Sequence, residues 1–503
     1  MTRNNHLYDQ VPVLVGQAQV IQHEDDISRA RGPIELMSDA VQHSFVDAGC
    51  AQPPSVDAIH VLKSLSTKVQ NPAAAISRAT GITARIHGYT THGGNLPQAL
   101  VNLSALEIQA GRADCIVLTG GESSRTRRRA RAAEINLDWV SGDDASTRDA
   151  QPTPIGGELE MLHPLEIERN IVLPIEIYPM FETALRSAAG MSIAQHRRHI
   201  SELWSRFSAV AADNPHAWIQ DRFSAEQIST TSESNRMVGY PYTKLMNSNN
   251  DVDMAAALVM CSVERAESLG IPRNRWVFPV AGTDAHEHNF VSHRWSFTET
   301  PAIRLGAKRL LELARWSIDE IDVTDLYSCF PSAVQLGAAS LGLGIDGPLT
   351  CTGGLSFAGG PFNNYVMHAI ATTMTALRKD SDAKALVWAN GGYATKHSFG
   401  AYQSTPPNHP FLHDSPQREV DALPKRHAAS ASEVSGDVTI EAYSVMHDRD
   451  GSPSRLAASV LTHDGIRSWA TTSDDGIMRH AIDHDFVGEI VRLLPTGELV
   501  GQS

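Results

Sequence analysis

Cysteine is scarce in this sequence, and its few thiols show no metal-binding spacing. The 503 residues include five cysteines, an odd number, and no two of them form a CxxC pair. This pattern argues against a structural zinc site and favours a reducing, cytoplasmic location, so we expect no metal ligands. The cysteines are Cys50, Cys115, Cys261, Cys329 and Cys351.

Positive charge and long apolar runs are also in short supply. There are 42 Lys and Arg residues against 57 Asp and Glu, a formal net charge of −15. This balance opposes general binding to nucleic acid or anionic membranes, which need a surface excess of basic residues. No stretch reaches the roughly 18 apolar residues of a membrane span, and the N-terminal MTRNNHLYDQVPVLVG lacks the apolar region of a signal peptide. We therefore expect a globular protein of two to four domains with no membrane span.

What the chain does have is an internal repeat. A helix, turn and strand pattern that begins at Pro33 returns at Pro301, about 270 residues later. The glycine pair Gly93-Gly94 precedes a helical stretch and the strand DCIVLTGGE, and Gly359-Gly360 precedes the same order with the strand KALVWANGGY. Preserved order and spacing predict a duplicated unit. The alternative is that any two βα units look alike.

The strands of both halves predict an α/β core. CIVLTG, AAALVMCS and ALVWAN are apolar without alternation, which is typical of strands covered by helices on both faces. We assign the first half to residues 1–280, with a helical insertion at about 122–240, and the second half to residues 281–405. Residues 406–420 are rich in proline and polar side chains and form a linker.

The last part of the chain has a different pattern. Residues 421–503 show two-residue alternation with turn signals at Asp450-Gly451 and Asp464-Gly465. This predicts a small antiparallel β-barrel module, similar to an OB-fold.

The glycine loops, the strand ends and the insertion together resemble the thiolase superfamily, in particular the sterol-carrier-protein type. The specific stretches are IYPMFETALRSAAGMSIAQHRRHISELWSRFSAVAADNPHA, GGLSFAGGP and NGGYATKHSFGAY. With the β module, the architecture looks most like the thiolase-like proteins of type 1. The resemblance implies a five-layer αβαβα core that holds a coenzyme A thioester, with an acyltransferase of the acetyl-coenzyme A acetyltransferase kind as the family activity in lipid metabolism. No permanently bound cofactor is implied.

The same resemblance shows that the family's reactive side chains are replaced. The nucleophilic cysteine matches Gly93, or His92 if the alignment shifts by one residue, and the activating histidine matches Gly360. The second cysteine matches Ala389, and the family's polar substrate loop begins at Tyr327. Thiolase chemistry needs a thiolate of lowered pKa at a helix N-terminus, so standard thiolysis is not expected.

Several polar groups near these loops remain as candidates. Catalytic roles are assigned to His92, Tyr327 as a hydrogen-bond donor and His397 as a base, although a structural histidine and a space-filling tyrosine are the alternatives. Backbone amides near the glycine loops suit a carbonyl oxygen or a pyrophosphate, with loop capping by asparagine as the alternative. The expected substrate-binding positions are Gly93, Asn95, Gly360, Asn390 and Gly391.

An arginine run follows the strand end at Gly120-Gly121. Arg125, Arg127 and Arg128 are candidates for binding the coenzyme A phosphates, and a solvated helix face is the alternative.

Three functions stay open at this point. The first is an acyl-coenzyme A binding protein without Claisen chemistry. The second is a cysteine-independent acyltransferase or a retro-aldol carbon–carbon lyase on a coenzyme A thioester. The third is a non-catalytic scaffold. The sequence does not decide between a monomer and a homodimer, because the strand ITARIHGYTT carries charged residues that oppose edge pairing.

Overall fold

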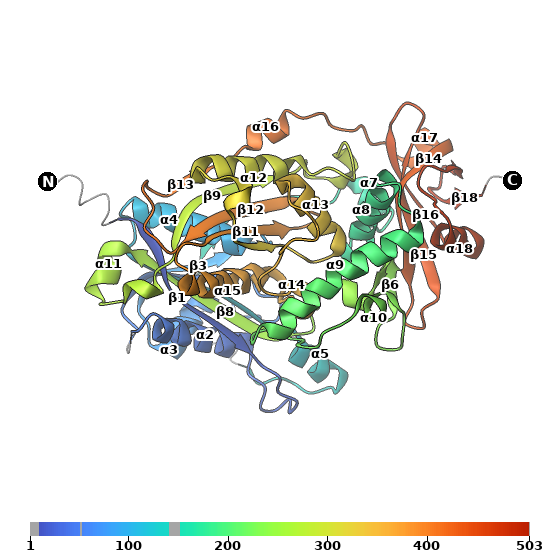
Figure 1. The fold of residues 1–503 in the computed structure, drawn as a ribbon. Helices are drawn as coiled ribbons and strands as arrows, with labels where there is room; N and C mark the ends of the chain where they lie inside the picture. The colour runs from blue at the N-terminus through green and yellow to red at the C-terminus, as the bar shows by residue number, and fades with distance from the viewer. Residues whose placement is uncertain (1–9, 51–52, 140–150, 502–503) are drawn as a thin grey trace.

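The computed structural model describes residues 10–50, 53–139 and 151–501 and contains three β-sheets (Figure 1). Two of these sheets lie face to face in the core, and the third lies at the end of the molecule that carries the C-terminus. None of the helices in the described ranges is both long and apolar enough to cross a membrane.

The first sheet is built from the first half of the chain. Its strands β1 and β8 pair antiparallel, β8 and β4 pair antiparallel, and the remaining neighbours are parallel. Strand β8 is buried along its whole length, as its unbroken apolar sequence predicts. In spatial order the strands are β1 (Pro12–Ile21), β8 (Asp253–Ser262), β4 (Cys115–Ser123), β2 (Val56–Val61), β3 (Ala84–Thr90) and β5 (Thr153–Ile155).

The second sheet repeats this arrangement. Strands β9 and β12 are antiparallel, β12 and β11 are antiparallel, and β11 and β10 are parallel, which reproduces the order and directions of β1, β8, β4 and β2. The predicted duplication is therefore confirmed at the level of strand pairing. The strands are β10 (Val323–Leu326), β11 (Lys384–Gly391), β12 (Lys396–Gln403), β9 (Phe278–His286) and β13 (Leu412–Asp414).

Helices complete a five-layer αβαβα core. Helices α2 (Pro33–Asp47) and α3 (Pro72–Thr80) cover the outer face of the first sheet, and α12 (Pro301–Ala314) and α13 (Pro331–Leu341) cover that of the second. Between the sheets, α4 (Leu96–Gln109) packs against α15 (Tyr365–Lys379). Proline stands in the first turn of α2, α3, α4, α12 and α13, where a missing backbone donor costs nothing.

The insertion forms the expected helical lobe. Its two long helices, α8 (Pro174–Ala188) and α9 (Ile193–Asp213), match the apolar periodicity of the sequence. Residues 140–150 of the insertion lie outside the described residues. The remaining elements of the lobe are α5 (Ser124–Ala132), α7 (Pro164–Glu168), α10 (Ala225–Ser229), β6 (Met237–Tyr240) and β7 (Tyr242–Thr243).

The C-terminal module is an antiparallel sheet of strand order β16-β15-β14-β17-β18, as predicted. A bridge between Thr471 and Glu498 brings its two edge strands together. The predicted turn glycines Gly451 and Gly465 both have positive φ, where glycine is favoured. The elements of the module are α17 (Ala431–Val434), β14 (Gly436–His447), β15 (Pro453–Leu461), β16 (Arg467–Thr472), α18 (Asp475–Asp483), β17 (Ile490–Leu493) and β18 (Leu499–Val500). The preceding helix α16 (Gln417–Asp421) packs against α12 and β9 of the core.

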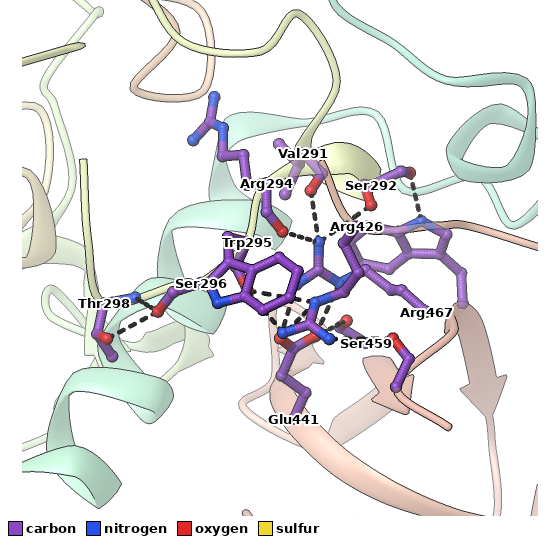
Figure 2. A network of polar contacts seen from close by, with 12 residues as sticks. Val291, Ser292, Arg294, Trp295, Ser296, Thr298, Arg426, Glu441, Ser459 and Arg467 are labelled. Carbon is purple, nitrogen blue, oxygen red and sulfur yellow. Dashed lines mark hydrogen bonds and ion pairs between the residues drawn. The ribbon is translucent and has the colours of Figure 1, made fainter. Parts of the chain in front are cut away.

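A buried arginine joins this module to the core (Figure 2). The Arg467 guanidinium is fully buried and pairs with Glu441 at 2.6 Å. It also donates to the backbone carbonyls of Val291 and Ser292, both at 3.0 Å, and to that of Arg294. Strand β6 of the lobe pairs with β14 as well. The module is therefore attached both to the lobe and to the second half of the core.

Candidate functional site

A cavity of about 430 Å³ lies where the glycine loops of the two halves meet the lobe. It is lined by apolar side chains, side-chain amides and glycine backbone. Among the described lining residues, Lys396 is the only lysine or arginine, and His92 is the only histidine. The lining comes from residues 92–94 before α4, from 327–330 after β10, from 390–396 around the turn between β11 and β12, and from positions between 161 and 178 and between 247 and 250 in and after the lobe.

The structure brings together many of the candidate residues at this cavity. His92, Gly93, Tyr327, Asn390 and Gly391 all line it. These residues come from both halves of the chain, so the cavity exists only because the duplicated units pack together. Asn95, Gly360 and His397 lie beside it without being part of its lining.

Side chains crowd the space beside Gly93. A Cβ atom on this residue would lie 2.5 Å from Asn95 Oδ1, closer than real Cβ atoms are found, and 3.0 Å from Lys396 Nζ, which is a tight contact. The Gly93 backbone N–H donates to Asn363 Oδ1 at 3.0 Å. Lys396, Asn95 and Asn363 thus fill the surroundings of the residue that the sequence aligns with the nucleophile.

The second family position, Gly360, is closed in a similar way. A Cβ atom there would collide with Ser248 Oγ and would lie 2.9 Å from Asn250 Oδ1. Ser248 and Asn250 line the cavity in its place. Ala389 is fully buried in β11 and offers no reactive group.

Tyr327 presents a free hydroxyl to the cavity. Burial raises the pKa of this phenol far above its usual value, so it stays protonated at neutral pH. The hydroxyl lies close to Gly94, since a Cβ atom added to that glycine would be 2.5 Å from it. It has no hydrogen-bond partner among the described residues. Tyr327 can therefore donate a hydrogen bond to a ligand but cannot act as a base.

Asn390 is fixed by a buried tyrosine. Its Nδ2 donates to the Tyr178 hydroxyl at 2.9 Å, and the same hydroxyl accepts from the Ala394 backbone N–H at 2.8 Å and donates to the Gly392 carbonyl at 3.2 Å. Asn390 Oδ1 is buried and has no partner among the described residues. Tyr178 thus holds the turn between β11 and β12 in the shape that lines the cavity.

His397 does not occupy the position expected of a cavity base. It follows Lys396 on β12, and successive residues of a strand point to opposite faces, so one lines the cavity and the other enters the core. Trp388 Nε1 donates to His397 Nδ1 at 3.3 Å, and burial lowers the pKa of His397 to about 3. The predicted role of His397 as a proton acceptor in the cavity therefore does not fit its position in the core.

The buried histidines predict an acid-sensitive fold. Burial lowers the pKa of His60 to about 4 and the pKa values of His368 and His397 to about 3. Unfolded rings titrate near pH 6.5, so stability is full above that pH and falls as the pH drops toward the folded pKa values. His397 alone should account for about 2 kcal/mol of the unfolding free energy that is lost between pH 7.5 and pH 5. Urea unfolding of His397→Asn at both pH values should therefore show a loss that is smaller by about 2 kcal/mol than in the parent. An equal loss in the variant and the parent would contradict this.

The comparisons with known proteins agree with the fold. Residues 416–498 match the family model described as the thiolase-like protein type 1 additional C-terminal domain. A crystal structure of a monomeric SCP2-thiolase like protein type 1 from Mycobacterium smegmatis is similar over 98% of this chain and 99% of that chain, with 28% identity and a TM-score of 0.83. The chain therefore has a thiolase-like fold, and its residues 416–498 match the additional C-terminal domain of the thiolase-like proteins of type 1.

Two other solved structures share the fold of this thiolase-like protein. An Ltp2-ChsH2(DUF35) aldolase is 18% identical, with a TM-score of 0.57, over 79% of this chain and 98% of that chain. The acetyl-CoA acetyltransferase from Syntrophomonas wolfei is 15% identical, with a TM-score of 0.53, over 78% of this chain and 99% of that chain. At these identities the likeness concerns the fold alone.

The cysteines of this thiolase-like protein do not provide an activated nucleophile. Cys329 lines the cavity, but burial raises the pKa of its thiol to about 12. Burial also raises the pKa of Cys115 to about 12, and Cys261 is buried in the neighbouring strand. Cys351 lies beside the buried Asp325 carboxylate, and burial raises its pKa as well. At neutral pH these thiols are protonated and poorly nucleophilic.

The arginine run lies on α5, away from the lining of the cavity. Arg125 pairs with Asp25 at 2.7 Å, and Arg128 forms a bidentate contact with Asp251, both bonds at 2.7 Å. Arg127 donates to the Leu65 carbonyl and lines a separate cavity of about 680 Å³. Arg128 nevertheless contacts a segment that contributes to the site, because its partner Asp251 directly follows the lining residue Asn250 in the chain.

Lys396 is a site residue that the sequence did not single out, as are Tyr178, Ser248 and Asn250. It contributes to the cavity lining, and its Nζ donates to the His92 carbonyl at 2.5 Å. Its position beside Gly93 arises from a contact across some 300 residues of chain. The only local signal was its place in TKHSFG, directly after a glycine loop. Among the described residues, no group of three or more His, Cys, Asp or Glu side chains is placed to bind a metal ion.

Proposed function

We propose that this thiolase-like protein binds an acyl-coenzyme A thioester in the cavity between its two halves without forming an acyl-cysteine. The observation that carries the proposal is the cavity itself. It keeps a volume suited to a small ligand, apolar walls and the free Tyr327 hydroxyl, while Lys396, Asn95, Ser248 and Asn250 fill the space beside the glycines that align with reactive positions.

The proposal is tested by ligand binding. Isothermal titration with acetyl-coenzyme A and longer acyl-coenzyme A thioesters should show saturable binding with one site per chain. The matched variant Tyr327→Phe keeps the ring and removes only the hydroxyl, so it should weaken thioester binding by about fivefold. Absence of binding to every thioester would favour the scaffold function instead.

A carbon–carbon lyase is the second candidate, and Tyr327 is the observation that favours it. The Tyr327 phenol is protonated and has no hydrogen-bond partner among the described residues, so it can donate a hydrogen bond to a substrate oxygen. Cleavage of a bond next to a thioester builds negative charge on such an oxygen, which a hydrogen-bond donor stabilises. The fold likeness to an aldolase is compatible with this function. Product formation from a hydroxyacyl-coenzyme A, lost in Tyr327→Phe, would distinguish it from binding alone.

The arginine run gives a separate prediction for coenzyme A phosphates. Arg127→Ala combined with Arg128→Ala should lower affinity for coenzyme A by about fivefold, because exposed charged contacts contribute about 1 kcal/mol or less. The measurement is titration calorimetry at low and high salt. Arg222→Ala is the matched control, since Arg222 pairs with Asp213 on the lobe at 2.7 Å and should leave affinity unchanged. Equal affinity for coenzyme A in the parent, the double variant and the control would show that the arginine run is a solvated helix face that does not bind the phosphates.

A further inference from the structure

The Lys396 side chain lines the cavity beside both glycine loops. A Cβ atom on Gly93 would lie 3.0 Å from its Nζ and 3.3 Å from its Cε, and a Cβ atom on Gly391 would lie 3.3 Å from the same Cε. The side chain therefore runs across both glycine loops and ends beside Gly93 and the His92 carbonyl. Any acyl group held at these loops meets this amine.

Among the described residues, no carboxylate contacts the Lys396 ammonium. The described lining residues include no Asp or Glu, and Lys396 forms no ion pair with a described residue. Its hydrogen-bond acceptor is the neutral backbone carbonyl of His92. Glu158, which is exposed and outside the lining, is the carboxylate that acts on Lys396, but burial outweighs it and lowers the pKa of the amine. His92 at the rim also has a lowered pKa and adds no negative charge.

A partly buried cation that contacts no carboxylate is complementary to an anionic ligand group, because the ligand charge offsets the cost of desolvation. We propose that the acyl group bound in this cavity carries a carboxylate and that Lys396 binds it, an inference that rests on the proposed thioester binding. The substrate class is then a carboxyacyl-coenzyme A thioester.

A phosphate of coenzyme A is the other anion that an ammonium binds, and the experiment separates the two. Affinities are measured by titration calorimetry for two matched pairs of ligands: malonyl- against propionyl-coenzyme A, and succinyl- against butyryl-coenzyme A. Members of a pair have equal carbon number and identical phosphates, so their ratio reports on the carboxylate alone.

The parent protein should bind each carboxyacyl thioester about tenfold more tightly than its uncharged partner. Lys396→Met, which keeps the aliphatic stem, should reduce this ratio to about one. Lys396→Gln keeps a hydrogen-bond donor for the His92 carbonyl without charge, and it should give the same result if the methionine variant does not fold. Lys63→Met is the control, because Lys63 lies over the Tyr89 ring outside the lining and should leave the ratio unchanged.

Three outcomes would overturn the inference. Equal affinity within each pair for the parent protein would remove the carboxylate preference and leave thioester binding intact. A preference that survives in both Lys396 variants would assign it to another group. A Lys396 variant that binds all four ligands more weakly by the same factor would show that the amine binds a coenzyme A phosphate instead of the acyl carboxylate. Failure of every thioester to bind the parent would instead contradict the proposed function itself.

Discussion

Replacing Arg467 with methionine is expected to lower the free energy of unfolding by about 3–5 kcal/mol. The guanidinium is fully buried, and its removal takes away the bidentate charge partner of the Glu441 carboxylate, which keeps only the more distant Arg426 at 3.9 Å. The carbonyls of Val291 and Ser292 lose a donor at the same time. Urea unfolding followed by circular dichroism and by tryptophan fluorescence measures the loss, and Trp469 reports on the junction because its Nε1 donates to Ser292 Oγ at 2.8 Å.

Arg479→Met in the same module is the matched control. Arg479 forms an exposed ion pair with Asp475 along α18, so its replacement should leave the unfolding midpoint unchanged. Equal midpoints for Arg467→Met and the parent would show that the buried pair does not hold the module to the core.

Tyr178→Phe is expected to lower the free energy of unfolding by about 2–4 kcal/mol and to weaken thioester binding. The substitution keeps the ring, which stacks on Phe330 with centroids 4.6 Å apart, and removes only the hydroxyl. Asn390 Nδ2, the Ala394 backbone N–H and the Gly392 carbonyl then lose a buried partner. Because these groups shape the turn that lines the cavity, stability and affinity should fall together. Chemical unfolding and titration calorimetry measure the two effects.

Tyr393→Phe serves as the control for this prediction. Its hydroxyl makes a single hydrogen bond, to the Val172 carbonyl at 2.6 Å, so its loss should cost about 1 kcal/mol. A Tyr178→Phe variant no less stable than Tyr393→Phe would mean that the hydroxyl does not organise the turn.

Local sequence patterns predicted most of the fold. The repeat is visible in the sequence because both units have the same order of helix, turn and strand. In the structure, the pairing of β1, β8, β4 and β2 is repeated by β9, β12, β11 and β10. The long helices α8 and α9 and the C-terminal sheet followed from periodicities of 3.6 and 2 residues. The domain boundaries at 280, 405 and 420 stay predictions.

The candidate site was predicted less completely, because its geometry depends on contacts between distant residues. Alignment of glycine loops identified Gly93 and Tyr327, but the fact that Asn363 and Lys396 flank Gly93 arises from packing of the two halves. His397 follows a glycine loop, which suggests the cavity, but alternation along β12 directs Lys396 to the cavity and His397 to the core, and a shift of one residue exchanges the two faces. Arg125 and Arg128 were candidates by charge, and their partners Asp25 and Asp251 lie far away in sequence.

The most direct test of the central claim is mass spectrometry of one sample under native and denaturing conditions after incubation with acetyl-coenzyme A. The account predicts a native species of the protein plus intact thioester and, after denaturation, the unmodified protein mass, since no described thiol at the cavity is activated and Gly93 replaces the nucleophile. A denatured protein heavier by one acetyl group, with the addition abolished by replacing a single cysteine, would contradict the account.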